Sequence, residues 1–376
     1  MRLGVDLSTY REVLTKNKNF YIDGKEVNPL DVFRKNGVSL ARIRLWNDPY
    51  DENGKPYLGG TCDLGNFIEL AKMQQSRGYE IVLCLHYSDF WADPGKQYLP
   101  KAWKKVVPCR LAKKLYRYTS KTLRIIKKEG INVAFVQIGN EITNGMLWPH
   151  GKLDGIDGRA RRGYEFLSEL LKKGTKAVKK VYPHAKTIIH LERSHDNAVY
   201  REFFTNIMSG GVPFDIIGMS YYPYWHGTFE QLSNNIKDMQ NTFHKGIMIM
   251  ETGYGFTMDD YLKTLDKNDR AQLVINDEFI KNMNNKLPYP LSEEGQASFV
   301  EQILTLARSL DVKAVFYWEP CWLPGDGICW ASPEGQAYIN ETDKETRNEW
   351  ANQCLFDYRG HALKGLSKFT LAEEEK

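Results

Sequence analysis

The chain has 376 residues, of which 42% are hydrophobic, so it is long enough to bury a large core and does not belong to the disordered class. Its 51 Lys and Arg nearly balance its 47 Asp and Glu, and the formal net charge is only +4. Nothing approaches the ~18 consecutive apolar residues that a transmembrane helix needs, so we expect no membrane span.

The first predicted strand, residues 3–8, follows Met1 almost directly and leaves no room for an apolar leader. We therefore expect a cytoplasmic protein if Met1 is the native start, and a secreted one if a leader has been removed.

Short apolar runs alternate with longer helical patterns along the whole chain. The runs are nearly continuous in apolar character, which is typical of parallel strands covered on both faces. Helical spacing is clearest at 63–77, 111–128 and 161–181. Eight alternations favour a single (β/α)8 barrel domain spanning residues 1–376 over an open doubly wound sheet, which would need a Gly-rich phosphate loop after its first strand. The eight predicted strands are 3–8, 40–46, 80–86, 134–139, 187–191, 215–220, 246–251 and 312–318.

Two basic runs, 101–105 and 121–128, allow two interpretations. They could form a nucleic-acid-binding patch, but solvated helix faces and helix C-termini explain them more simply, so we predict no nucleic-acid partner.

Polar and aromatic residues end most of the predicted strands. In a barrel these ends open on the face that carries the active site. Glu141 and Glu251 end the fourth and seventh strands, on opposite sides of the barrel mouth. A carboxyl group at a buried strand end must be paired or must have a raised pKa. Two carboxyl groups facing one pocket suit glycoside hydrolysis, in which one donates a proton and the other attacks the anomeric carbon.

Aromatic residues in the loops strengthen the carbohydrate interpretation, because Trp and Tyr stack on sugar rings, although about half of them could simply pack loops onto the barrel. There is no HExxH, GxSxG or Cys–His motif, and the six cysteines lack zinc spacing. Cys321 and Cys329 could pair in an exported protein, but free thiols are an equal alternative. The tryptophans concerned are Trp91, Trp103, Trp148, Trp225, Trp318, Trp322 and Trp330.

Several blocks, in order along nearly the whole chain, resemble glycoside hydrolase family 53. This is the family of endo-β-1,4-galactanases that cut type I arabinogalactan, within the retaining barrels of clan A. The blocks are 42–49 (RIRLWNDP), 86–97 (HYSDFWADPGKQ), 136–149 (VQIGNEITNGMLWP), 217–227 (IGMSYYPYWHG), 250–252 (MET), 318–320 (WEP) and 352–357 (NQCLFD).

The resemblance implies that Glu141 is the acid/base and Glu251 the nucleophile of a retaining hydrolase acting on galactan, type I arabinogalactan or derived galacto-oligosaccharides. It also implies a set of orienting and substrate-binding residues. Arg44, His86, His190 and Tyr222 would orient the two carboxyl groups, Asn140 would bind the sugar 2-hydroxyl, Trp91, Trp225 and Trp318 would line subsites, and Asp89 would contribute to substrate binding.

Some bacterial members of the family bind calcium through an Asp-x-Asp-x-His loop after the seventh strand. Here 253–260 and 266–269 contain acidic residues at a different spacing, so we expect no metal and no cofactor. We expect a monomer whose partner is the galactan substrate. Another clan A specificity, such as β-mannanase or β-glucanase, and a non-catalytic sugar-binding barrel are the alternatives.

Overall fold

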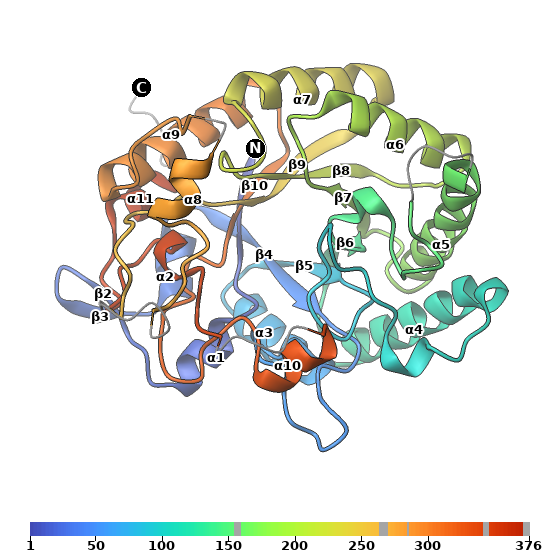
Figure 1. The fold of residues 1–376 in the computed structure, drawn as a ribbon, viewed down its shortest axis with the longest axis horizontal. Helices are drawn as coiled ribbons and strands as arrows, with labels where there is room; N and C mark the ends of the chain where they lie inside the picture. The colour runs from blue at the N-terminus through green and yellow to red at the C-terminus, as the bar shows by residue number, and fades with distance from the viewer. Residues whose placement is uncertain (154–158, 263–269, 284–285, 341–345, 371–376) are drawn as a thin grey trace.

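The computed structural model describes residues 1–153, 159–262, 270–283, 286–340 and 346–370, with only the backbone described for 159–162. Its centre is a closed barrel of parallel strands (Figure 1) in the order β1-β10-β9-β8-β7-β6-β5-β4. This confirms the predicted (β/α)8 architecture and all eight predicted strands. The barrel strands are β1 (Arg2–Asp6), β4 (Val38–Leu45), β5 (Glu80–Leu85), β6 (Val133–Ile138), β7 (Lys186–Leu191), β8 (Ile216–Tyr221), β9 (Gly246–Thr252) and β10 (Ala314–Trp318).

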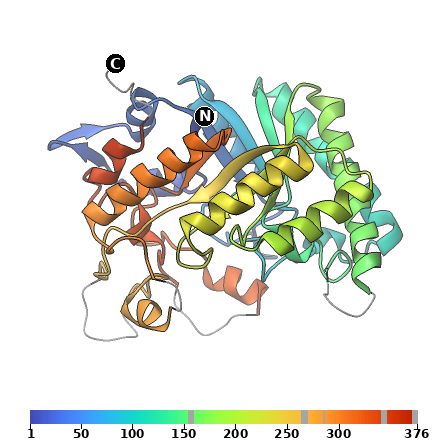
Figure 2. The same cartoon turned by 90° about the horizontal axis from the view of Figure 1, so that it is seen from above.

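Helices cover the outside of the barrel, as the view from above in Figure 2 shows. The three helices expected from periodicity are present as α3, α4 and α5. Many helices begin at a side-chain cap, such as Asp63 before α3 and Thr228 before α7, which satisfies amide groups left free by the first turn. The helices are α1 (Tyr10–Thr15), α2 (Pro29–Lys35), α3 (Leu64–Gln75), α4 (Pro108–Lys128), α5 (Arg159–Val181), α6 (Asn197–Ser209), α7 (Phe229–Phe243), α8 (Asp277–Asn282), α9 (Glu293–Ser309), α10 (Pro333–Tyr338) and α11 (Lys364–Lys368), with 3-10 turns η1 (Lys101–Trp103), η2 (Ile142–Asn144) and η4 (Ala351–Gln353).

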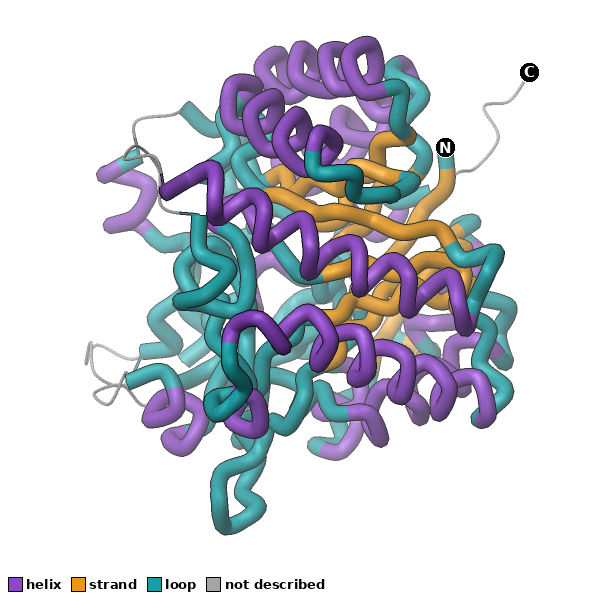
Figure 3. Tube along the Cα trace, turned by 90° about the vertical axis from the view of Figure 1, so that its right-hand side faces the viewer, coloured by secondary structure: helices purple, strands orange, loops and turns teal. Residues whose placement is uncertain are grey.

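Two apolar layers form the core, because successive strand residues point to opposite faces. Residues such as Leu83, Ile189 and Ile249 face outward and pack in the cluster that contains the helices' apolar residues. A smaller cluster, which includes Leu40, Phe316 and Met250, fills the barrel interior. Figure 3 shows long helices lying across the strands from outside.

Sequence periodicity did not reveal the antiparallel hairpin of β2 (Phe20–Ile22) and β3 (Lys25–Val27), whose strands have only three residues each. None of the helices in the described residues combines the length and apolar character needed to cross a bilayer.

Candidate active site

A buried polar layer separates the apolar interior of the barrel from its mouth. Because the strand period is two, the position two residues beyond an interior apolar residue also points inward. Leu40 is thus followed by Arg42, Val82 by Cys84, and Ile188 by His190, all fully buried. Arg42 spans this layer, with Nη1 2.7 Å from Asp6 and Nε 3.1 Å from Gln137. The catalytic carboxyl groups rest on this layer.

Glu141 follows β6 in a left-handed backbone conformation, with φ 48° and ψ 53°. A non-glycine residue in this region costs roughly 1–2 kcal/mol, so neighbouring groups must hold it. The Gln97 side-chain amide donates to the Asn140 carbonyl at 2.7 Å, and the Asn144 amide donates to the Pro94 carbonyl at 3.0 Å. The loop after β5 therefore fixes the turn that aims Glu141 into the mouth.

Glu251 reaches the interior because β9 contains one extra residue. Ile249 pairs with Met219 on β8, but the next pair joins Ser220 to Glu251; the pairing with β10 also skips a residue of β9 there. A β-bulge of this kind re-aims a side chain. Met250 packs in the interior cluster, and Glu251 directly after it also points inward, where its Oε1 lies 2.8 Å from Arg42 Nη2.

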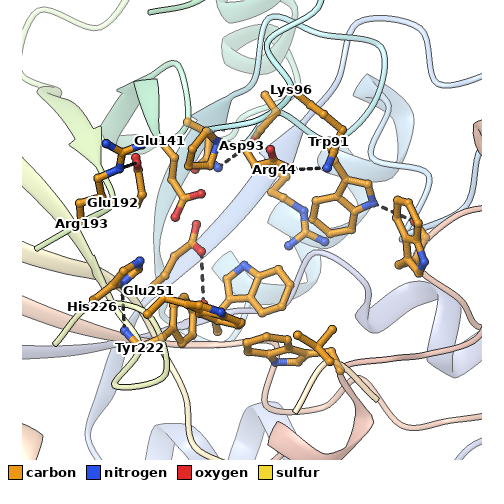
Figure 4. A pocket seen from close by; sticks show the side chains of 18 of the residues that line it. Arg44, Trp91, Asp93, Lys96, Glu141, Glu192, Arg193, Tyr222, His226 and Glu251 are labelled. Atoms are coloured by element: carbon orange, nitrogen blue, oxygen red, sulfur yellow. Dashed lines mark hydrogen bonds and ion pairs between the residues drawn. The ribbon is translucent and has the colours of Figure 1, made fainter. Parts of the chain in front are cut away.

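The two carboxyl groups face one another across the mouth (Figure 4), with one oxygen of each within 4.8 Å of the other. Retaining glycosidases place the two groups about 5–5.5 Å apart, whereas inverting ones leave about 6.5–9.5 Å for a water molecule. The separation is therefore that of a retaining enzyme.

The surroundings of the two glutamates differ in charge. Burial raises the pKa of Glu141 well above its usual range, the charges of Glu251 and Glu192 raise it further, and a 2.5 Å hydrogen bond from Ser220 lowers it. Burial also raises the pKa of Glu251, but there the Arg42 guanidinium is the largest opposing influence. A proton shared between the two sites therefore resides on Glu141, and Glu251 is the ionised partner.

Tyr222 and His190 support the glutamates in different ways. The Tyr222 hydroxyl donates to Glu251 Oε2 at 3.3 Å, as the resemblance implied. His190 is fully buried and, among the described residues, has no hydrogen bond to either carboxyl group; its Nε2 lies 2.9 Å from Ser220 Oγ, which donates to Glu141. His190 therefore acts on Glu141 through Ser220.

His86 faces the cleft as a neutral hydrogen-bond donor. Its Nδ1 receives hydrogen bonds from Trp46 Nε1 at 3.2 Å and from the Ala92 amide at 3.1 Å, so the ring proton must be on Nε2. Burial lowers the pKa of His86 well below its usual range, and the nearby arginines lower it further. No described residue accepts a hydrogen bond from Nε2, which leaves this donor for a sugar hydroxyl.

Asn140 also lines the cleft. Its carbonyl oxygen accepts from Arg42 at 2.8 Å and from Gln137 at 2.9 Å, and its amide donates to the Ala92 carbonyl. One amide hydrogen remains for substrate, so its contact with a sugar 2-hydroxyl stays a prediction.

Arg44 lines the cleft but forms no ion pair with either catalytic carboxyl group among the described residues, and its charge lowers the pKa of Glu251 less than that of Arg42 does. Its guanidinium forms ion pairs with Glu319 at 2.7 Å and Asp6 at 3.3 Å, and it stacks 4.3 Å from the Trp91 ring. The strand turns both Arg42 and Arg44 inward, but Arg44 is one step nearer the mouth, where Glu319 of β10 meets it. Arg42 holds Glu251, and Arg44 supports the aromatic wall.

Asp89 is likewise not a cleft residue. It is fully buried, its Oδ2 accepts a hydrogen bond from the Lys101 amide at 2.6 Å, and it does not line the cleft. It follows β5 by four residues and lies in the loop, two residues before Trp91, which does line the cleft. Its role is to tie this loop to η1.

The cleft has a volume of about 1020 Å³ and two unlike walls. One wall is aromatic, and its rings are Trp91, Trp318, Trp322, Trp330 and Trp350. The other carries paired charges from the loops after β5 and β7, namely Asp93 with Lys96 and Glu192 with Arg193, beside Trp225 and His226. The expected platforms Trp91, Trp225 and Trp318 all line it.

Sequence reasoning missed four contributors to this site. Arg42 could have been found from the period of two, which places it on the same strand face as Arg44. Asp6 could have been found because it lies at the end of the first strand. Glu192 lies two residues beyond His190 on the same face. Trp350 had no such signal, because it comes from the loop region before η4.

The only group in the described residues with three candidate metal ligands close together is Glu141, His190 and Glu251, which is the catalytic centre itself. Asp260 accepts hydrogen bonds from the Leu262 and Ala271 amides and so ties its own loop. Segment 266–269 lies outside the described residues. Cys321 and Cys329 are free and buried.

Comparison with known proteins identifies the family of the chain. The family model described as glycosyl hydrolase family 53 matches residues 2–369. The chain is 32% identical to the endo-beta-1,4-galactanase of Bacillus subtilis (strain 168), over 98% of this chain and 85% of that protein. It is also 32% identical to the arabinogalactan endo-beta-1,4-galactanase of Cellvibrio japonicus, over 91% and 87%. A solved family 53 catalytic domain from Ignisphaera aggregans superimposes with a TM-score of 0.87 at 33% identity, covering 99% of this chain and 96% of that one.

Proposed function

Because this chain belongs to glycosyl hydrolase family 53, we propose that it hydrolyses internal β-1,4-galactosidic bonds of galactan by double displacement. Glu141 serves as acid/base and Glu251 as nucleophile. The observation that carries the proposal is the pair of facing carboxyl groups, one ion-paired with Arg42 and the other surrounded by acidic groups.

In the first step, the ionised Glu251 carboxylate attacks the anomeric carbon while Glu141 gives its proton to the glycosidic oxygen. The bond to the leaving chain breaks, and a covalent glycosyl ester forms on Glu251. In the second step, Glu141, now ionised, takes a proton from water as the water oxygen attacks the anomeric carbon. The ester breaks, and both glutamates return to their starting states with the anomeric configuration retained.

The supporting residues fit this cycle. Arg42 and the Tyr222 hydroxyl both contact Glu251, so they stabilise its negative charge before attack and its release as a leaving group afterwards. Ser220 donates to Glu141 when Glu141 is ionised, and its oxygen can accept when Glu141 holds the proton. Glu141 can therefore gain or lose its proton while keeping its hydrogen bond with Ser220.

Four of the five tryptophans of the aromatic wall come from the end of β10 or the region after it, which adjoins the Glu251 strand β9, and the charged pairs come from the loops after β5 and β7, which flank the Glu141 strand β6. The nucleophile bonds to the glycone, whereas the acid protonates the leaving group, so we assign the five tryptophans to the glycone and the charged wall to the leaving chain. Aromatic stacking provides apolar contact that a neutral sugar ring can match. The expected galactose specificity rests on the named relatives.

The test is hydrolysis of linear β-1,4-galactan beside β-mannan, xylan and a soluble β-glucan. We expect reducing-sugar release from galactan alone, with mixed oligosaccharides appearing early, and β-anomers as first products in proton NMR spectra. Faster hydrolysis of another polymer would support the clan A alternative. First products with the α configuration would contradict the mechanism. Fractionation of the native organism tests the localisation, for which the cytoplasm and, if a leader has been removed, secretion are the two predictions.

A further inference from the structure

Helix α4 carries an unbroken line of positive charge on its solvent side. Arg and Lys recur at alternating intervals of four and three residues, which places them on one face over about 27 Å of helix. All are exposed except Lys114, which is half-buried. We call this line the α4 stripe; its members are Arg110, Lys114, Arg117, Lys121, Arg124 and Lys128.

No acidic residue interrupts the α4 stripe. The 21 residues of α4 contain eight Lys or Arg and no Asp or Glu. The whole chain has a formal charge of +4, so with α4 contributing +8 the remainder stands at −4. Other outer helices are mixed in charge: α9 has Glu293, Glu294 and Glu301 with Arg308, and α7 has Glu230 and Asp238 with Lys237. The basic character is therefore local to this part of the barrel surface.

The stripe cations also lack ion-pair partners. Among the described residues, no ion pair involves any of the six, although Lys114 lies 5.9 Å from the Trp103 ring. By contrast, Lys172 and Lys173 of the neighbouring α5 pair with Glu169, and Lys179 pairs with Asp215. Like charges at three- and four-residue spacing destabilise a helix. A merely solvated face gains nothing from such an arrangement, whereas a polyanion would neutralise it.

The neighbouring surface extends the positive field. Lys176 and Lys180 of α5 act electrostatically on Tyr116, on the flank of α4 that faces α5, so they add positive charge beside the helix rather than along the stripe itself. Figure 1 places α4 and α5 on the same side of the barrel, and Figure 3 looks from that side. Closely grouped unpaired cations attract an extended anion along the whole ridge.

We propose that the α4 stripe is a docking site for an acidic polysaccharide, a polymer bearing one carboxylate on each of many successive sugar units. This choice of partner rests on the proposed function, because a polysaccharide hydrolase meets such polymers with its substrate. The stripe cations follow one another about every 4.5–6 Å along the axis, a spacing suited to a regular linear polyanion.

The surroundings favour this partner over a lipid surface or a nucleic acid. The only large exposed apolar residue of the described chain near α4 is Val107, at its N-cap, so the stripe has nothing to insert into a bilayer. The buried face of α4 packs on the barrel, which leaves a convex ridge rather than a helix free to enter a groove.

The stripe also has a defined direction relative to the cleft. Helix α4 follows the β5 loop, which supplies Trp91 and Asp93 to the cleft, so Arg110 lies toward the mouth and Lys128 toward the barrel bottom. Neutral chains attached to a polymer bound on the stripe would therefore be held near the catalytic mouth.

Binding of polygalacturonate, followed by affinity electrophoresis and calorimetry at 50 mM NaCl, tests the proposal. The stripe variant combines Arg117→Gln, Lys121→Gln and Arg124→Gln, which keep helix propensity. The control combines Lys25→Gln, Lys35→Gln and Lys237→Gln, three exposed cations elsewhere, so both proteins lose the same charge. Circular dichroism establishes that both are folded.

We expect the wild type and the control to bind alike and the stripe variant to bind about tenfold more weakly or not at all, with wild-type binding abolished by 0.5 M NaCl. Absence of wild-type binding, or equal weakening in both variants, would overturn the proposal. So would tighter binding of duplex DNA or of phosphatidylglycerol vesicles at equal charge concentration. Hydrolysis of neutral galactan is measured separately and should be the same in all three proteins; inactivity of all three would refute the proposed function alone and leave the binding result standing.

Discussion

Two glutamates of one chemical type lie on opposite sides of the barrel mouth and have opposite surroundings. On the β9 side, Glu251 contacts a fixed cation, Arg42, and the Tyr222 hydroxyl. On the β6 side, the Glu141 carboxyl group accepts a hydrogen bond from the neutral Ser220 hydroxyl, and the charges of Glu251, Glu192 and Asp93 raise its pKa. The difference teaches that the division into acid and nucleophile is made by neighbours from other strands, not by the glutamates themselves.

Removing each carboxyl group gives the largest expected effect. Glu251→Ala should abolish turnover even of aryl galactosides with activated leaving groups, because no nucleophile remains. Glu141→Ala should reduce galactan hydrolysis by about 10²–10⁴-fold but spare the first step for activated substrates, which need no proton. Steady-state and burst kinetics on dinitrophenyl galactosides measure both effects.

Azide provides the control for this assignment. With Glu141→Ala it should restore the second step and yield the β-galactosyl azide, and with Glu251→Ala it should yield the inverted α-azide. The inverted product from Glu141→Ala would mean that the roles are exchanged.

Replacing Arg42, the cation that contacts Glu251, should shift the acidic limb of the pH profile of kcat/KM. Arg42 lowers the pKa of Glu251, which must be ionised to attack, so Arg42→Gln should shift this limb of kcat/KM to higher pH. Arg44→Gln is the matched control, since Arg44 is equally buried and also pairs with Asp6, but it pairs with Glu319 rather than Glu251 and lowers the pKa of Glu251 less, so its shift should be smaller. Both variants should lose about 3–5 kcal/mol of stability. Equal shifts in the two profiles would contradict the assignment of Arg42.

Removing a negative charge on the β6 side should move the basic limb in the opposite sense. Glu192 raises the pKa of Glu141, which must be protonated to act as acid, so Glu192→Gln should move this limb to lower pH. The expected shift is between a few tenths and about one pH unit. Gln can still accept the 2.5 Å hydrogen bond from Thr143, so a structural loss is avoided.

Asp196→Asn is the control for Glu192→Gln, because Asp196 also lines the cleft and Asn can keep its cap on α6. Its basic limb should coincide with that of the wild type. A shift of the same size in both variants would show that the general charge of the wall matters, rather than Glu192.

The smallest expected effect concerns metal. EDTA should leave activity and melting temperature nearly unchanged, because the acidic residues after the seventh strand lack the calcium-loop spacing. A clear fall in melting temperature that calcium reverses would place a metal at Asp259, Asp260 or segment 266–269.

The eight strands and the two glutamates were predictable, because buried parallel strands are continuous apolar runs and a terminal carboxyl group stands out against them. The ion-pair partner of Glu251 was not predictable. Arg42 and Arg44 share one face of their strand, and only the three-dimensional register decides which of the two arginines reaches Glu251 of β9. The prediction for Asp89 was wrong for another reason. It lies four residues beyond its strand, in a loop whose direction cannot be inferred from the two-residue period of a strand. The extra residue in β9 also leaves no pattern in the sequence, because Ile249, Met250 and Glu251 fit a regular strand equally well.

The bulge in β9 makes the catalytic centre depend on how the backbone of a strand pairs with its neighbours as well as on the identity of its residues. If the same residues of β9 formed a regular ladder without the bulge, Glu251 would follow the inward-facing Met250 and its carboxyl group would turn into the barrel wall. Selection for a more regular sheet and selection for activity therefore act in opposite directions at this point. Over evolutionary time, this strand can change many of its side chains, but with its present number of residues it must keep the bulge for Glu251 to reach the cleft.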